Sequence, residues 1–190
     1  MCTANICRSP YAQFHLQRGL DSLSPGIFQV RSAGTMAVEG QAMDPSSARY
    51  VELLGEHTEG FTARMLTPTM VQEADLVLTM TTEHRSAVLE LTPRALKRTF
   101  TVVEFATLAA SIPPEHERDT PTGSTPADVV ARWKVLPRLL SGLRSSVKNT
   151  PMDVADPYRR GDAAYATMVQ QLSAALDVII KAEQRWQHGT

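Results

Sequence analysis

Apolar positions in this chain follow two alternating patterns. Residues 75–80 carry three consecutive aliphatic side chains at their centre, as buried strands do. Residues 9–20 instead place apolar side chains at Ala12, Leu16 and Leu20, four residues apart, which predicts a helix with one inward face. The alternation of strand-like and helix-like stretches favours βαβ units, and therefore a parallel sheet covered by helices.

Capping residues divide the chain into elements. Ser9-Pro10, Asp44-Pro45 and Thr67-Pro68 each place a capping side chain before a proline, which predicts a helix start. The further elements that we predict are strands at residues 27–31, 75–80 and 99–103, a helix through Val88 and Leu91, and a last helix at residues 162–186.

Residues 111–125 differ from the rest of the chain because they are rich in Pro, Thr, Glu and Asp, which predicts an exposed flexible loop. A helical pattern follows, and Pro137 is expected to kink or end that helix. We interpret residues 111–149 as an insertion, a flexible loop plus a helix, within a single domain formed by residues 1–190.

The composition is ordinary for a soluble globular protein, with 43% hydrophobic and 21% charged residues. The formal net charge of -1 gives no electrostatic reason to expect nucleic acid or an anionic membrane as a partner. We see no apolar run near the roughly 20 residues of a membrane helix, and no secretory signal. We therefore expect a cytoplasmic protein with no nucleic-acid and no membrane partner.

The two cysteines, Cys2 and Cys7, lie close together at the start of the chain. Two cysteines alone form neither a disulfide framework nor a structural zinc site, and a reducing compartment is expected. His84, His116 and His188 do not fall at metal-ligand spacing with carboxylates, so we expect no metal and no cofactor.

The segment CTANICRSP places Cys2 and Arg8 with five residues between them, directly before a predicted helix start. Attack on phosphorus needs a thiolate, which a helix N-terminus and a nearby cation both favour. Five intervening residues can curl their N–H groups around an anion, and a guanidinium can bind two phosphoryl oxygens. The pattern indicates covalent catalysis by a cysteine. Because Cys-x5-Arg alone occurs in many unrelated chains, a buried cysteine near a surface arginine is the alternative.

The full string resembles the phosphate loop of the low-molecular-weight protein tyrosine phosphatase family, in its bacterial form, whose usual sequence is VCxGNICRSP. The similarity continues in the family's order to a distant Asp-Pro-Tyr and covers most of the chain outside residues 111–149. The matching segments are Ser32-Ala33-Gly34-Thr35, Asp44-Pro45, Thr62-Ala63-Arg64, residues 74–80, His84-Arg85 and Asp156-Pro157-Tyr158.

The resemblance implies catalytic roles for three residues. Cys2 is the nucleophile and Arg8 binds the phosphate. Asp156 is the general acid that protonates the leaving phenolate, and then the base that activates water. A positioned proton donor typically contributes about 10²–10⁴-fold to the rate. From the residues alone, a turn residue or helix cap before Pro157 is the alternative for Asp156.

The same resemblance implies supporting roles around the phosphate. Asn5 holds the loop in its strained shape, Ser9 hydrogen-bonds the thiolate, and Ser32 helps to orient the loop. Tyr158 forms an aromatic wall of the substrate cleft or, as the alternative, is a packing residue. The residues expected around the phosphate are Thr3, Ala4, Asn5, Ile6, Cys7 and Ser9.

Cys7 is open to two interpretations. It is either a redox partner that forms a reversible disulfide with Cys2, as family members can, or a small buried hydrophobic residue. Two positions depart from the family pattern: Ala4 stands for the usual glycine, and Phe61 for a frequent histidine.

The resemblance implies a three-layer αβα fold with a twisted, mainly parallel sheet of about four strands and the phosphate loop at the N-terminus. In the family a strand in the middle of the sheet leads into the nucleophile, whereas here Met1 alone precedes Cys2. We therefore expect the first strand to be absent, its two neighbours to lose ladder partners, and the natural protein to begin upstream.

The expected function is that of a metal-free phosphatase, acting as a monomer or weak dimer on a phosphotyrosine-containing protein or a small aryl phosphate. A catalytically impaired module that binds phosphate or phosphotyrosine is the alternative, because the first strand is missing. An arsenate reductase would need relay cysteines beyond Cys7, and a protein-arginine phosphatase favours threonine where Ile6 stands.

Overall fold

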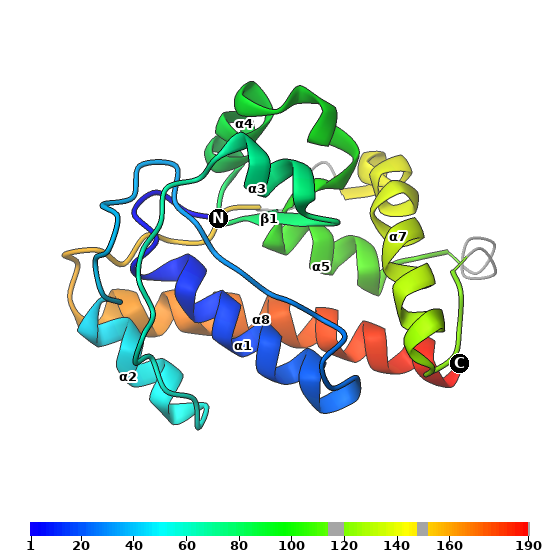
Figure 1. Cartoon of the computed structure of the whole chain (residues 1–190), viewed down its shortest axis with the longest axis horizontal. Coiled ribbons are helices and arrows are strands. Elements are labelled where there is room, and N and C mark those ends of the chain that lie inside the picture. The colour runs from blue at the N-terminus through cyan, green and yellow to red at the C-terminus, as the bar shows by residue number, and fades with distance from the viewer. Residues whose placement is uncertain (114–119, 148–151, 190) are drawn as a thin grey trace.

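The structure, a computed structural model of residues 1–190, describes all residues except 114–119, 148–151 and 190. Helices surround a small parallel sheet (Figure 1). In chain order the elements are α1 (Arg8–Leu23), α2 (Pro45–Leu53), α3 (Pro68–Glu73), β1 (Val77–Thr79), α4 (Thr82–Leu91), η1 (Pro93–Arg98), β2 (Thr99–Thr101), α5 (Val102–Ala110), α7 (Pro126–Gly142), η2 (Arg144–Val147) and α8 (Asp162–His188).

The sheet consists of the parallel strands β1 and β2, which pair in register from Val77 with Thr99. Single parallel bridges continue the pairing on the other side of β1, where Cys2 pairs with Gly34 and Gly34 with Met65. The predicted parallel arrangement is therefore present in part. It has two strands and a row of bridges, whereas the family has about four strands, of which we expect the first to be absent here.

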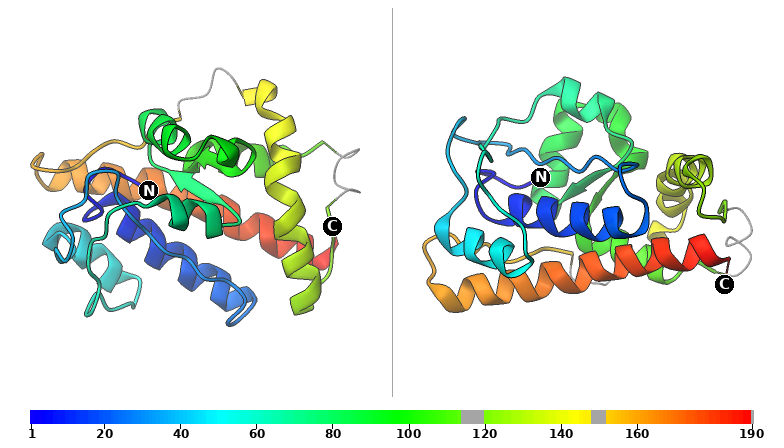
Figure 2. Two further views of the ribbon diagram at one scale, coloured as in Figure 1. Left: turned by 45° about the horizontal axis from the view of Figure 1, so that its top comes forward. Right: turned by 60° about the horizontal axis from the view of Figure 1, so that its bottom comes forward.

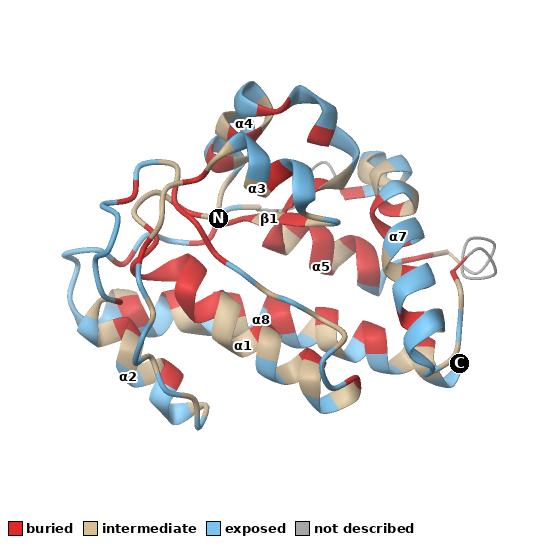
Figure 3. Ribbon diagram, in the orientation of Figure 1, coloured by how far each residue is buried: buried red, intermediate tan, exposed pale blue. Residues whose placement is uncertain are grey.

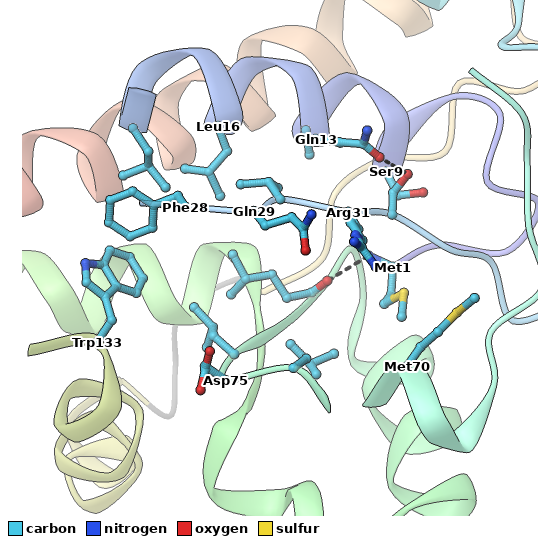
Figure 4. Close-up of a pocket in the computed structure, with 18 of the residues that line it drawn as sticks. Met1, Ser9, Gln13, Leu16, Phe28, Gln29, Arg31, Met70, Asp75 and Trp133 are labelled. Carbon is cyan, nitrogen blue, oxygen red and sulfur yellow. Dashed lines mark hydrogen bonds between the residues drawn. The ribbon is translucent and has the colours of Figure 1, made fainter. Parts of the chain in front are cut away.

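The predicted strand at residues 27–31 is wrong. These residues have no regular secondary structure, because a cavity with a volume of about 440 Å³ lies between them and β1 (Figure 4). A strand forms only where a neighbour completes its hydrogen bonds, so the apolar pattern alone is not sufficient here.

Helices cover both faces of the sheet. α1 and α8 lie side by side, and α5 packs against α8 and the two strands (Figures 1 and 2). The buried residues follow the facing sides of these helices and form the main core (Figure 3). A smaller apolar cluster, which includes Val71, Val77 and Val88, lies between α3, α4 and β1.

Of the three helix starts predicted from a capping residue followed by proline, two have the predicted cap. The carboxylate of Asp44 caps α2 and the hydroxyl of Thr67 caps α3. α1 begins at Arg8, one residue before the predicted Ser9 cap. The predicted strand at residues 99–103 ends at Thr101, since Thr101 caps α5.

The apolar pattern does not predict α5. Its signal is a capping box in which the Thr101 hydroxyl accepts from the Glu104 amide while the Glu104 carboxylate accepts from the Thr101 amide. The nearly continuous apolar run that follows resembles a buried strand in sequence, whereas most of the helix is buried on all sides.

α7 occupies much of the predicted insertion, part of which (residues 114–119 and 148–149) lies outside the described residues. We expect Pro137 to kink or end this helix; the helix continues to Gly142, so Pro137 does not end it. Pro137 has no N–H for the helix ladder. Burial of its side chain together with Leu136 and Leu140 offsets that loss.

A buried ion pair joins α7 to α8. The Arg132 guanidinium donates to the Glu183 carboxylate at 2.9 and 2.5 Å, and both side chains are fully buried. The Trp133 indole and the Gln187 amide also donate to Glu183, so the charge is surrounded by donors. The pair fixes how α7 docks on the domain.

α8 is the one described helix that is long and apolar enough to cross a bilayer by length and composition. Its apolar side chains pack against α1 and α5 in the core, as those of a core helix do.

Replacing Arg132 with leucine should lower the free energy of unfolding by about 3–5 kcal/mol, because Glu183 is left buried without its cation. Urea titration followed by circular dichroism measures the change. The double variant Arg132→Leu/Glu183→Gln should recover part of the loss. A single variant as stable as the unsubstituted protein would contradict a structural role for the pair.

Candidate active site

Residues 2–7 form a loop that leads directly into α1. Cys7 is the N-cap residue, and no side chain caps the helix. The open N-terminus of a helix favours anions through its unpaired N–H groups and its dipole. Four of the six loop residues are buried, among them Cys2 at 3% exposure, and Arg8, the first residue of α1, is 5% exposed.

The loop turns its carbonyls outwards. The Cys2, Thr3 and Ile6 carbonyls accept hydrogen bonds from neighbouring amides at 2.9 to 3.0 Å. Within the described part of the chain, no backbone or side-chain group accepts a hydrogen bond from the N–H groups of residues 3–7. These groups are therefore available to an anion in the loop.

Asn5 holds this shape from inside the loop. Its φ of 59° lies in the left-handed region, which asparagine tolerates better than most residues. The fully buried side chain donates to the Ser9 and Ser32 hydroxyls, each at 2.9 Å, and accepts from the Arg64 amide at 3.1 Å. Every hydrogen of the amide group is thus paired, and the strained backbone is tied at three points.

The Ser9 hydroxyl links Asn5 to the sulfur of Cys2. It lies 3.0 Å from Cys2 Sγ. Because Ser9 Oγ accepts from Asn5, its own hydrogen is available to donate to the sulfur. The Ser32 hydroxyl, which accepts the second hydrogen of the Asn5 amide, donates to Gln13 of α1 at 2.8 Å. The loop is thereby joined to α1.

Gly34 lies against the outer side of the loop. A β-carbon at this position would lie 2.3 Å from the Thr3 carbonyl oxygen and 3.0 Å from backbone atoms of Ala4 and Asn5. The loop can approach this closely only because residue 34 has no side chain.

His84 contacts the loop from α4. Its Nε2 lies 2.9 Å from the Thr3 hydroxyl and its Nδ1 2.7 Å from the Thr81 hydroxyl. Burial, together with the positive charge of Arg8, lowers the pKa of His84 to about 4, so the ring is neutral near neutral pH. The family match includes His84, yet no pattern in the sequence alone indicates that it touches Thr3.

Arg8 and Asp156 form an ion pair at the mouth of the loop. The guanidinium donates to Asp156 Oδ2 at 2.7 Å and to the Val154 carbonyl at 3.4 Å. The other carboxylate oxygen accepts from the Tyr158 amide at 3.2 Å, an Asx-type turn that orients the acid. Asp156 is half exposed, whereas Arg8 is buried.

The chain reaches Asp156 along a segment that is tied to the sheet. The Val154 amide donates to the Met80 carbonyl, and Asp153 accepts from the Thr82 amide at the start of α4. These bonds bring a residue 148 positions distant in sequence to Arg8.

Three exposed apolar side chains belong to segments that contact the loop or carry Asp156. Met36, Val38 and Tyr158 are exposed at 71%, 67% and 45%, and the Met36 amide is bonded to the Thr3 carbonyl. The guanidinium of Arg159 lies 5.1 Å from the centre of the Tyr158 ring. The sequence patterns do not single out Met36 or Val38.

The Cys7 side chain contacts α8. Its sulfur lies 3.8 Å from the Tyr165 hydroxyl. Burial raises the pKa of the Cys7 thiol to about 12, and nearby negative charge at Asp44 adds to the rise. Both cysteines are free thiols, and the choice between a redox partner and a buried hydrophobic residue stays open.

The structure brings the predicted site residues together: Cys2, Thr3, Ala4, Asn5, Ile6, Cys7, Arg8 and Ser9 form the loop, Ser32 supports it, and Asp156 and Tyr158 lie at its mouth. What each does in catalysis stays a prediction. Outside residues 114–119, 148–151 and 190, no three His, Cys, Asp or Glu side chains are grouped so as to hold a metal ion.

A family profile described as low molecular weight phosphotyrosine protein phosphatase matches residues 1–116, more than half of the chain. The chain is 35% identical over 102 residues to the low molecular weight protein-tyrosine-phosphatase Etp of Escherichia coli (strain K12), covering 52% of this chain and 64% of that protein. It is 34% identical over 93 residues to Wzb of Salmonella typhi, covering 49% and 59%. The matches span less than two thirds of these relatives' own length.

Two solved structures have a similar fold. The YwlE arginine phosphatase from Geobacillus stearothermophilus has a TM-score of 0.68 at 24% identity, over 98% of this chain and 92% of that chain. The tyrosine phosphatase Wzb from Escherichia coli K30, in complex with phosphate, has a TM-score of 0.62 at 24% identity, over 96% and 88%.

Replacing Gly34 with alanine should weaken the binding of inorganic phosphate by about 100-fold, since the new methyl group displaces backbone of the loop by about 1 Å. Isothermal titration calorimetry measures the affinity. Gly142→Ala is the matched control, because a β-carbon there meets no atom within 4 Å. Equal phosphate affinity in the two variants would show that the close approach at Gly34 does not shape the loop.

Proposed function

Because the chain belongs to the low molecular weight phosphotyrosine protein phosphatase family, we propose that it hydrolyses aryl phosphate monoesters, including phosphotyrosine in a protein, through a phosphocysteine at Cys2. One observation carries the proposal: a loop whose N–H groups have no acceptor among the described residues holds a cysteine next to a serine hydroxyl, and an arginine paired with an aspartate lies beside it.

The proposed reaction has two displacements. In the first, the Cys2 thiolate forms a bond to phosphorus while the bond from phosphorus to the aryl oxygen breaks, and Asp156 gives its proton to that oxygen. In the second, Asp156 takes a proton from water, whose oxygen attacks the phosphocysteine. Inorganic phosphate leaves and the thiolate is restored.

The loop supplies electrostatic stabilisation in both steps. Its N–H groups and the N-terminus of α1 surround the equatorial oxygens of the transferring phosphoryl group, and the Arg8 guanidinium has the fork geometry to bind two of them. These donors are built before the substrate arrives, so little reorganisation accompanies the reaction.

In the proposed reaction, Arg8 exchanges its ion pair with Asp156 for one with the phosphate of the substrate. An incoming phosphate competes with Asp156 for the guanidinium. When Arg8 turns to the phosphate, the Asp156 carboxyl group leaves the ion pair and becomes available to the leaving oxygen of the substrate. Substrate binding thereby prepares the general acid.

A catalytically impaired phosphate-binding module is the second candidate. The cavity beside β1 favours it, because the loop follows directly from an incomplete part of the sheet. Such a module would bind phosphate or vanadate at the same loop without turnover.

Other phosphoryl chemistries fit less well. The loop carries Ile6, a buried aliphatic residue, where arginine phosphatases favour a hydroxyl. Arsenate reduction needs a relay of cysteines, and the chain has two. We also propose that the protein works in the cytoplasm as a monomer or weak dimer.

Cys2→Ser should abolish hydrolysis of p-nitrophenyl phosphate at mildly acidic pH, because serine is not ionised there, while EDTA leaves the unsubstituted chain fully active. Cys7→Ser is the matched control and should keep most of the activity, since Cys7 does not attack phosphorus. Activity that survives in Cys2→Ser would exclude the cysteine mechanism. Phosphate binding without turnover by the unsubstituted chain would favour the binding module.

Asp156→Asn should lower kcat about 10²–10⁴-fold for phenyl phosphate, a poor leaving group, and much less for p-nitrophenyl phosphate, whose leaving group needs little protonation. Steady-state kinetics on both esters measure the difference. Asp162→Asn is the control, because this exposed carboxylate pairs with Arg49 outside the loop. An equal loss on both esters would contradict the role of Asp156 as the proton donor.

A further inference from the structure

The segment from Asp156 to Asp162 leads from the phosphate loop into α8 and contains two carboxylates and two arginines. Each carboxylate is paired with an arginine of another helix. Asp156 pairs with Arg8 of α1 at 2.7 Å, and Asp162 pairs with Arg49 of α2 at 3.4 Å. The negative charges of the segment are therefore already neutralised from outside it.

The two arginines of the segment, Arg159 and Arg160, are not neutralised in this way. Both side chains are exposed. No carboxylate of the described residues forms an ion pair with either guanidinium. Two excess positive charges therefore lie a few residues from Asp156, although the whole chain has a net charge of -1.

A tight turn fixes the position of Arg159. The Arg160 amide donates to the Pro157 carbonyl at 3.0 Å, which closes a turn with Tyr158 and Arg159 at its two central positions. The φ of Arg159 is 59°, in the left-handed region, at a turn position that glycine or asparagine usually occupies. The turn alone would favour one of those residues, so it does not account for an arginine there.

The Arg159 guanidinium lies 5.1 Å from the centre of the Tyr158 ring. This is within the distance of about 6 Å at which a cation is attracted to an aromatic face. The Tyr158 amide in turn donates to the Asp156 carboxylate at 3.2 Å. The turn therefore holds a positive charge beside the residue that we propose as the proton donor.

A phosphotyrosine in the loop would carry its peptide close to these charges. In the proposed reaction the leaving oxygen lies at Asp156, so the peptide continues from there. An extended peptide rises about 3.3 Å per residue, which keeps positions within three residues of the phosphotyrosine about 10 Å away or less. A carboxylate at such a position can pair with a guanidinium, which binds carboxylates through two parallel hydrogen bonds.

Resting on the phosphatase function proposed above, we propose that Arg159 and Arg160 select protein substrates that carry Asp or Glu within about three residues of the phosphotyrosine. Exposed ion pairs each change an equilibrium constant by up to about fivefold, and salt screens them. Anionic membranes typically attract clusters of about four to eight basic residues. Two arginines beside a phosphate loop therefore favour an acidic phosphopeptide over a lipid surface.

Two peptides of equal length test the proposal: acetyl-EDE-pY-EDE-amide and its neutral counterpart acetyl-QNQ-pY-QNQ-amide. Release of inorganic phosphate gives kcat/KM for each. We expect the acidic peptide to be favoured by about five- to tenfold at low ionic strength, and the ratio to approach one in about 0.5 M NaCl. A ratio of one at low ionic strength would overturn the proposal.

The double variant Arg159→Gly/Arg160→Gln should lower the ratio to about one. Its Tm should not fall, because glycine adopts the left-handed backbone of residue 159 without strain. Lys134→Gln/Arg138→Gln is the matched control. It removes the same charge from exposed positions of α7, at the other end of the molecule (Figures 1 and 2), and should keep the ratio. An equal loss in both variants would assign the preference to net charge and overturn the proposal.

Binding to Cys2→Ser, measured by fluorescence anisotropy of the labelled peptides, separates this proposal from the phosphatase function. Tighter binding of the acidic peptide supports the role of the two arginines even if the unsubstituted chain shows no turnover. Turnover of both peptides without a preference overturns that role alone. Vesicles that contain phosphatidylserine test the lipid alternative. Vesicle binding that Arg159→Gly/Arg160→Gln abolishes, with equal affinity for the two peptides, would also overturn the proposal.

Discussion

The three hydrogen bonds of the Asn5 side chain are the constraint on which the site depends. Asn5 adopts a left-handed backbone conformation inside a buried loop, which costs free energy unless the surroundings fix it. Its amide donates to Ser9 and Ser32, and its carbonyl oxygen accepts from the Arg64 amide. One side chain thereby sets the curvature of the loop, the position of the hydroxyl beside Cys2, and the approach of residues 32–34.

Other parts of the molecule hold the loop and Asp156 in place. Gly34 lets its own segment lie against the loop, and the same residue links Cys2 to Met65 through two parallel bridges. α1 begins where the loop ends, so its N-terminus is directed into the loop, where we propose that the phosphate binds. The segment before α8 is tied to Met80 and carries Asp156 to Arg8. The groups that we propose for phosphate binding and for proton transfer thus lie at one end of the sheet.

Much of this arrangement is visible in the sequence because local chemistry determines it. The Cys-x5-Arg string predicts the loop, and capping pairs such as Asp44-Pro45 predict helix starts. Contacts between residues that are far apart in the sequence cannot be predicted in this way. The contact of His84 with Thr3 depends on tertiary packing over 81 positions, and no local signal encodes it. The strand expected at residues 27–31 fails for the same reason, since its pairing depends on a neighbour and not on its own pattern.

We propose that this loop performs covalent chemistry at Cys2. Rapid acid quenching during turnover of an aryl phosphate, followed by mass spectrometry of the proteolysed protein, measures the intermediate. We predict one phosphoryl group on the peptide that contains Cys2, appearing before the first turnover is complete. Turnover with no phosphoryl group on that peptide, or with the group on another residue, would contradict it.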